Sequence, residues 1–259
     1  MLKRSTERGW RSRINGDPTG RFKGIPVHMG CAVQDERLRD KRGHLFICDT
    51  FLGIEPLEEA YEYLREVGID KPVIVFISHG DYDHYWGNGA FKNTVILAQE
   101  GCWERIHDEH EETYARHTHH KMGMVELVLP NMIFKERVIF PEDGVEFYHT
   151  PGHSKDSSSC MDVKDHILFV GDNVESPLPY IYRQDLDVYI NSLEGYIERT
   201  PKTVISGHDP PMSNLSLVKE NLEYVKKVKN DKVDTSKLDE RSKKIHEQNM
   251  KTMEGTKTF

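Results

Sequence analysis

Residues 79–84 place four metal-capable side chains within six positions, directly after an apolar run. The cluster is His79-Gly80-Asp81-Tyr82-Asp83-His84, and the run before it covers residues 73–77 and follows Pro72. A short, β-branched apolar run predicts a buried strand. The cluster would then lie at the C-terminal end of that strand, where α/β folds place their chemistry. Because crowded carboxylates and imidazoles lose solvation unless a cation organises them, the sequence predicts a metal-binding loop.

Four more short polar segments each follow an apolar run. They are Cys48-Asp49-Thr50, Thr150-Pro151-Gly152-His153-Ser154, Gly171-Asp172-Asn173 and Ser206-Gly207-His208-Asp209. The runs before them predict strands over 44–48, 145–149, 167–170 and 203–205. A single His after Gly occurs by chance, but five such segments in this order carry a specific signal. Over residues 25–210, the chain resembles the metallo-β-lactamase superfamily.

This resemblance implies an α/β fold, a four-layer αβ/βα sandwich of the metallo-β-lactamase type, with two metal ions at its open edge. The resemblance implies two groups of ligands that share one member. The first metal would take His79, Asp81 and His153, and the second would take Asp83, His84 and His208. Asp172 would bridge both metals, together with a hydroxide. In the family, a residue at the position of Asp49 supports the metal loop through hydrogen bonds, and we expect the same role here.

Asp81 departs from the commonest family pattern, which has a second His at this position. A carboxylate hardens the site, so iron or manganese become plausible, although zinc, the metal we expect first, also accepts Asp oxygen. The flavodiiron branch has Glu here, which makes a di-iron redox or oxygen-sensing protein the alternative function. That branch carries a fused flavodoxin domain, for which this chain has no room. A second alternative is that Asp81 lies outside the ligand shell.

The resemblance implies a dinuclear metal-dependent hydrolase that attacks a small ester, thioester, lactone or similar bond with the bridging hydroxide. Asp83 would orient the hydroxide and accept its proton, and Asp172 would hold the two metals together. Tyr85, Tyr180 and Tyr182 are candidates for the substrate pocket. Some lactonase-type relatives have a Tyr shortly after the bridging Asp. In this chain Glu175 stands near that position, which leaves Tyr180 or Tyr182 as the candidates for that role. The substrate itself cannot be read from the fold.

Length and charge favour one compact enzyme domain. The 259 residues are 37% hydrophobic, enough for a substantial core, and the formal charge of -8 gives no reason to bind nucleic acid. Only a short segment separates Asp172 from His208, whereas nuclease branches often insert a domain there. We expect an irregular arm over 1–24, the main domain over 25–212 and a helical extension over 213–259. A small molecule is the expected partner.

The four cysteines, Cys31, Cys48, Cys102 and Cys160, show no paired spacing. They predict buried, reduced thiols and a cytoplasmic location. The basic N-terminus lacks the apolar stretch of an export signal, and no run is long enough for a membrane span. We therefore expect a protein that does not associate with membranes.

Apolar spacing predicts helices over 56–67 and 215–228. We also expect a polar helix over 99–116, a helix over 186–199 and a more charged amphipathic helix over 236–250. Further strands are expected over 24–28, 94–98, 137–140 and 159–163, with a hairpin tip at 35–43. A turn is expected at 164–166. It accounts for Asp165 and His166 as turn residues and not as metal ligands. The His-rich segment 107–120 is interpreted as a solvated helix and loop, which could border the active site. The apolar stripe on 215–228 suits packing on the domain or a homodimer, and the pattern does not distinguish them.

Overall fold

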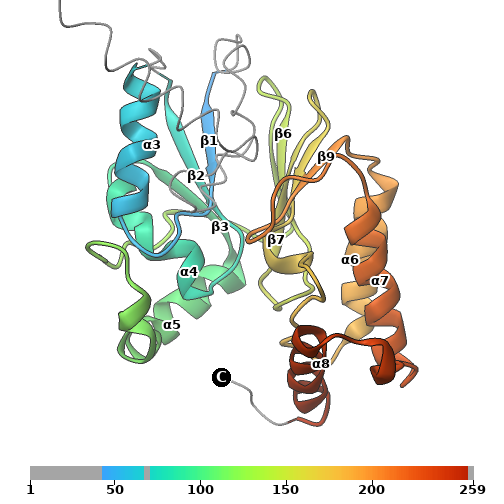
Figure 1. The fold of residues 1–259 in the computed structure, drawn as a ribbon. Helices are drawn as coiled ribbons and strands as arrows, with labels where there is room; N and C mark the ends of the chain where they lie inside the picture. The colour runs from blue at the N-terminus through green and yellow to red at the C-terminus, as the bar shows by residue number, and fades with distance from the viewer. Residues whose placement is uncertain (1–42, 67–70, 256–259) are drawn as a thin grey trace, which may run out of the picture.

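The computed structural model describes residues 43–66 and 71–255, which form two β-sheets flanked by helices (Figure 1). The predicted arm over 1–24, the strand over 24–28, Cys31 and nearly all of the hairpin tip at 35–43 lie outside the described residues. Within the described ranges, no helix is long and apolar enough to cross a bilayer.

The N-terminal sheet contains four parallel strands in the order β1-β2-β3-β4. They are β1 (Leu45–Cys48), β2 (Val73–Ile77), β3 (Val95–Gln99) and β4 (Met132–Phe134). The first three lie within one residue of the predicted bounds. Strand β4 was not predicted, because it has only three residues and two of them are exposed. Helices α3 (Glu55–Glu66) and α5 (Glu100–His117) lie on the outer side of this sheet (Figure 1).

The C-terminal sheet contains five strands in the order β5-β6-β7-β8-β9. They are β5 (Arg137–Phe140), β6 (Val145–His149), β7 (Ser158–Asp162), β8 (Ile167–Phe169) and β9 (Thr203–Ile205). All pairs are antiparallel except β8 with β9. The turn predicted between β7 and β8 is confirmed, because Asp162 Oδ1 accepts hydrogen bonds from the backbone N–H groups of Lys164 and Asp165.

An apolar layer joins the two sheets face to face. Its centre is aromatic: the ring of Phe147 from β6 lies 4.7 Å from that of Phe76 in β2 and 5.5 Å from that of Phe46 in β1. Cys48 and Cys160 belong to the same buried cluster, as expected for thiols that pack as small hydrophobes. With helices outside each sheet, this interface confirms the predicted four-layer αβ/βα sandwich (Figure 1).

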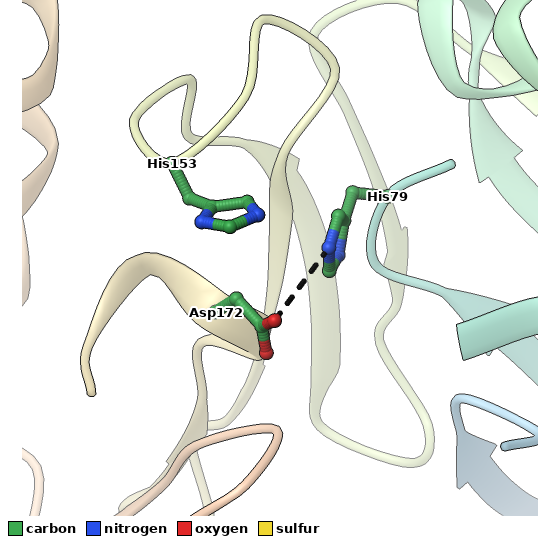
Figure 2. A group of neighbouring side chains, drawn as sticks. All are labelled: His79, His153 and Asp172. Atoms are coloured by element: carbon green, nitrogen blue, oxygen red, sulfur yellow. Dashed lines mark ion pairs between the residues drawn. The ribbon is translucent and has the colours of Figure 1, made fainter. Parts of the chain in front are cut away.

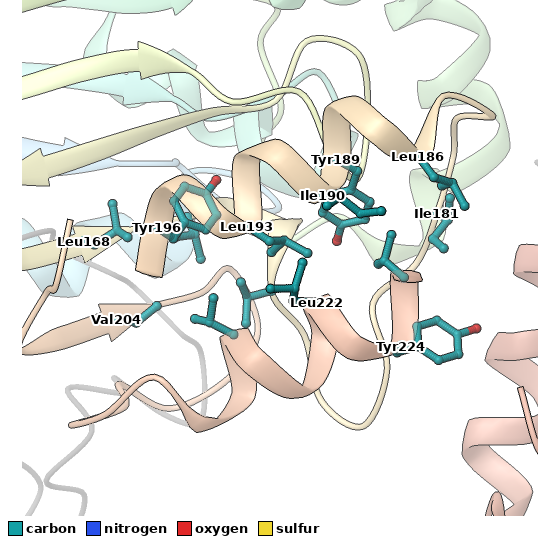
Figure 3. Close-up of a cluster of buried hydrophobic side chains, with 14 of the residues drawn as sticks. Leu168, Ile181, Leu186, Tyr189, Ile190, Leu193, Tyr196, Val204, Leu222 and Tyr224 are labelled. Atoms are coloured by element: carbon teal, nitrogen blue, oxygen red, sulfur yellow. The ribbon is translucent and has the colours of Figure 1, made fainter. Parts of the chain in front are cut away.

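The C-terminal helices are α6 (Leu186–Glu198), α7 (Ser216–Lys229) and α8 (Glu240–Met253). The apolar stripe of α7 packs within the chain, where Leu222 shares a buried cluster with Leu193 of α6 (Figure 3). Helix α8 begins later than the predicted residue 236. Asp239 sets this start as the N-cap, because its side chain accepts a hydrogen bond from the backbone N–H of Ser242 at 2.8 Å.

Candidate metal centre

Loops at the ends of strands from both sheets bring the predicted ligands together at one edge of the sandwich. His79 follows β2, Asp83 and His84 lie on the short helix α4 (Tyr82–Tyr85), His153 lies between β6 and β7, Asp172 lies in the turn Gly171–Asn173 after β8, and His208 follows β9. Figure 2 shows His79, His153 and Asp172 directed toward a common point from three separate loops. The strands therefore bring residues from distant parts of the sequence into one cluster.

The first group of potential ligands surrounds Asp81 and Asp172. Oδ2 of Asp81 lies 3.2 Å from Nε2 of His79 and 3.0 Å from Nε2 of His153. Nε2 of His79 also lies 3.8 Å from Oδ2 of Asp172. Single donor atoms from His79, His153 and Asp172 all lie within 4.8 Å of one another, close enough to share one metal ion.

The second group consists of Asp83, His84 and His208, whose donor atoms also lie within 4.8 Å of one another. Oδ2 of Asp172 lies 3.2 Å from Nε2 of His84 and 3.1 Å from Nε2 of His208. Nε2 of His208 is also 3.4 Å from Oδ2 of Asp83. Asp172 therefore contacts both groups, the position that a bridging ligand requires.

The charge and burial of the potential ligand atoms suit a bound cation. Oδ1 of Asp172 is buried and has no hydrogen-bond partner among the described residues, which is costly for a carboxylate unless a cation binds it. The charge of Asp172 raises the pKa of His208 to about 9. Burial opposes a proton on His153, but its hydrogen bond to Asp81 and the charge of Asp81 raise its pKa to about 9 as well. The carboxylates thus favour positive charge at the centre of the cluster.

Asp49 contacts the ligands from outside the cluster. Its Oδ2 accepts a hydrogen bond from Nδ1 of His84 at 2.7 Å, and both of its oxygens accept hydrogen bonds from Ser78, at 2.7 Å each. These bonds orient the imidazole of His84 so that Nε2 faces Asp172. Such an outer partner is a common feature of metal-binding histidines.

The absence of a side chain at Gly207 makes room for the ligand cluster. A Cβ atom at this position would lie 2.0 Å from Oδ1 of Asp172 and 2.9 Å from Cε1 of His84. Both distances are shorter than van der Waals contact, so any side chain here must displace the carboxylate or the imidazole.

We expect Gly207→Ala to weaken metal binding by roughly 10- to 100-fold, the range found when the partners of ligands are disturbed. Metal content by mass spectrometry and competition with a chromophoric chelator would measure this loss. Gly195→Ala is the matched control, because nothing lies within 4 Å of a Cβ atom at Gly195 in α6. Unchanged metal affinity in Gly207→Ala would contradict this interpretation of the site.

A cavity of about 1110 Å³ opens beside the cluster. Tyr180 and Tyr182, two of the three tyrosines predicted for the substrate pocket, line it. Tyr85 does not. It is 2% exposed within the core of the N-terminal half, and its hydroxyl lies 3.1 Å from Nδ1 of His110. The apolar surroundings of the loop after His84, which the sequence alone did not reveal, bury this ring.

The cavity walls include residues that the sequence did not point to. Helix α5 contributes Arg105, and α8 contributes Arg241 and Lys244. Glu175 also lines the cavity: its Oε2 accepts a hydrogen bond from the backbone N–H of Tyr180 at 3.1 Å, and burial together with the charge of Asp172 raises its pKa to about 8. Glu175 stands three residues after Asp172 in the sequence, but the sequence pattern assigns it no role.

The His-rich segment borders the cavity, and the rings of His117, His119 and His120 lie close together without forming a metal-binding group among the described residues. His117 lines the wall and stacks on Tyr82, with ring centroids 4.4 Å apart. Among the described residues, the groups able to hold a metal include none of the histidines at 107–120, and neither Asp165 nor His166. The interpretation of this segment as a helix and loop beside the active site agrees with its position.

Comparisons with known proteins point to one family. The model described as the metallo-beta-lactamase superfamily matches residues 38–208. An N-acyl homoserine lactonase of Bacillus sp is 34% identical over 38% of this chain and 36% of its own length, and one of Bacillus thuringiensis is 30% identical over 56% of this chain and 60% of its own. The matches thus span about a third to three fifths of these relatives. A metallo-beta-lactamase structure from Pontibacter korlensis superposes with a TM-score of 0.53 at 19% identity, covering 72% of this chain and 84% of that one.

Proposed function

The chain belongs to the metallo-beta-lactamase superfamily, and we propose that it is a dinuclear metal-dependent hydrolase of a small ester, thioester or lactone. The convergence of both ligand groups on Asp172 is the observation that carries this proposal. Two relatives are named N-acyl homoserine lactonases, which supports a carboxylic ester or lactone as the substrate class. The cavity volume of about 1110 Å³ leaves room for such a molecule.

His79, Asp81 and His153 would hold one divalent metal ion, Asp83, His84 and His208 the other, with Asp172 between them. When bound, two such ions lower the pKa of water so that hydroxide is present at neutral pH, and they polarise the substrate carbonyl. Asp83 would orient the attacking water and take its proton, and its position in the cavity wall supports this role. The hydrogen bond from the Tyr180 backbone to Glu175 fixes the wall on which the substrate would lie.

Purified protein should contain about two metal ions per chain, with zinc expected first. It should hydrolyse at least one member of a panel of aryl esters, acyl thioesters and homoserine lactones. A chelator should remove this activity, and added zinc or manganese should restore it. Full metal occupancy with no turnover of any panel member would contradict a hydrolase of this class.

The alternative is a di-iron redox or oxygen-sensing protein, which the carboxylate of Asp81 next to His79 and His153 favours. It predicts iron in the purified protein, visible absorption, and oxygen consumption when a reductant is supplied. The same metal analysis therefore separates the two functions.

A further inference from the structure

The two oxygens of Asp81 have different partners. Oδ2 faces the ligand cluster, 3.2 Å from Nε2 of His79 and 3.0 Å from Nε2 of His153. Oδ1 faces away from it and forms an ion pair with Nη2 of Arg105 on α5. The carboxylate therefore presents one oxygen to the cluster and one to a guanidinium.

Arg105 is itself fixed to the metal-binding loop. Its Nη1 lies 3.5 Å from Oδ1 of Asp156, whose Oδ2 accepts a hydrogen bond from the backbone N–H of Gly80 at 2.7 Å. Its Nε donates to Oε2 of Glu109 at 3.2 Å. The aliphatic stem of Arg105 packs on Gly80, because a Cβ atom at Gly80 would lie 3.1–3.2 Å from the stem carbons. The guanidinium and the loop thus hold each other in one arrangement.

We propose that Arg105 is a positioning residue that makes Asp81 a single-oxygen ligand in place of the family's imidazole. By binding Oδ1, the guanidinium stops the carboxylate from rotating to offer both oxygens, and it balances the charge that Asp81 adds to the site. Buried carboxylates need such a partner, and the planar fork of Arg suits both Asp81 and Asp156. This inference rests on the proposed metal centre.

The test compares metal affinity in two backgrounds. Arg105→Met keeps much of the stem but removes the charge, and we expect the zinc affinity to fall by roughly 10- to 100-fold in the natural background. In an Asp81→His background, the same change should cause a distinctly smaller loss, because an imidazole has no second oxygen to restrain and no charge to balance, and only the contacts of Arg105 with Asp156 and Gly80 remain to be lost. Competition with a chromophoric chelator measures both affinities, and circular dichroism of the metal-free variants reports their folding. Arg105→Lys keeps the charge but lacks the planar guanidinium. Its zinc affinity should lie between that of the unmodified protein and that of Arg105→Met.

Arg137→Met is the matched control, because Arg137 pairs with Glu146 on the C-terminal sheet and is 64% exposed. Its zinc affinity should equal that of the unmodified protein. An equal loss for Arg105→Met in both backgrounds would show a merely structural role and overturn the inference, as would unchanged affinity in the natural background. These results leave the proposed function intact. If the unmodified protein binds no metal, the proposed function is wrong and the inference falls with it.

Discussion

Replacing Asp172 with alanine is expected to lower kcat/KM by more than about 100-fold. Substitution of a residue that only supports the ligands lowers metal affinity or activity by roughly 10- to 100-fold. Substitution of a residue that contacts both ligand groups should lower the activity further. Oδ2 of Asp172 lies 3.2 Å from Nε2 of His84 and 3.1 Å from Nε2 of His208, so its loss leaves the buried imidazole of His84 and the more exposed one of His208 without their common partner. The metal content should fall below two ions per chain.

The measurement pairs kinetics on the best substrate with metal analysis of the same sample. Asp187→Ala is the control, because Asp187 is an aspartate on α6 that is 69% exposed and pairs with Lys229 on the surface. That variant should keep its metals and its activity. If Asp172→Ala retained both metals and full turnover, Asp172 would not be the bridging ligand, and the proposed mechanism would be wrong.

The candidate ligands could be proposed from the sequence because each lies in the loop, or on the short helix, that follows a predicted strand. The run before His79 and the runs before Asp172 and His208 are short and apolar, and they form β2, β8 and β9 within one residue of their predicted bounds. Since the family places ligands at strand ends, the order of these short segments along the chain was enough to bring together residues from both sheets.

The partners of the ligands could not be predicted in the same way. Arg105 is 24 positions from Asp81, on a helix that contains many other charged residues, so no local pattern singles it out. The cavity wall from α8 depends on how the last helix packs, which its spacing alone does not specify. Tyr85 shows the opposite case: its place beside His84 suggested the pocket, but tertiary packing buries it in the core.

Replacing Phe147 with alanine is expected to destabilise the fold by about 3–5 kcal/mol, the usual cost of truncating a buried Phe. Its side chain is fully buried between the sheets, with ring centroids 4.7 Å from Phe76 and 5.5 Å from Phe46. The truncation would leave a cavity that neighbours from two rigid sheets cannot readily fill. Urea unfolding of the metal-free protein, followed by circular dichroism, measures the change.

Ile139→Ala on the neighbouring strand β5 is the control, because Ile139 is 48% exposed and its truncation should cost less than about 1 kcal/mol. A loss of similar size in both variants would mean that the aromatic layer does not hold the sheets together. The same layer positions the candidate metal centre, because His79 follows a strand of one sheet and Asp172 a strand of the other. A metal ion bound there would link the two sheets and favour the folded state, so zinc should recover part of the stability that Phe147→Ala loses.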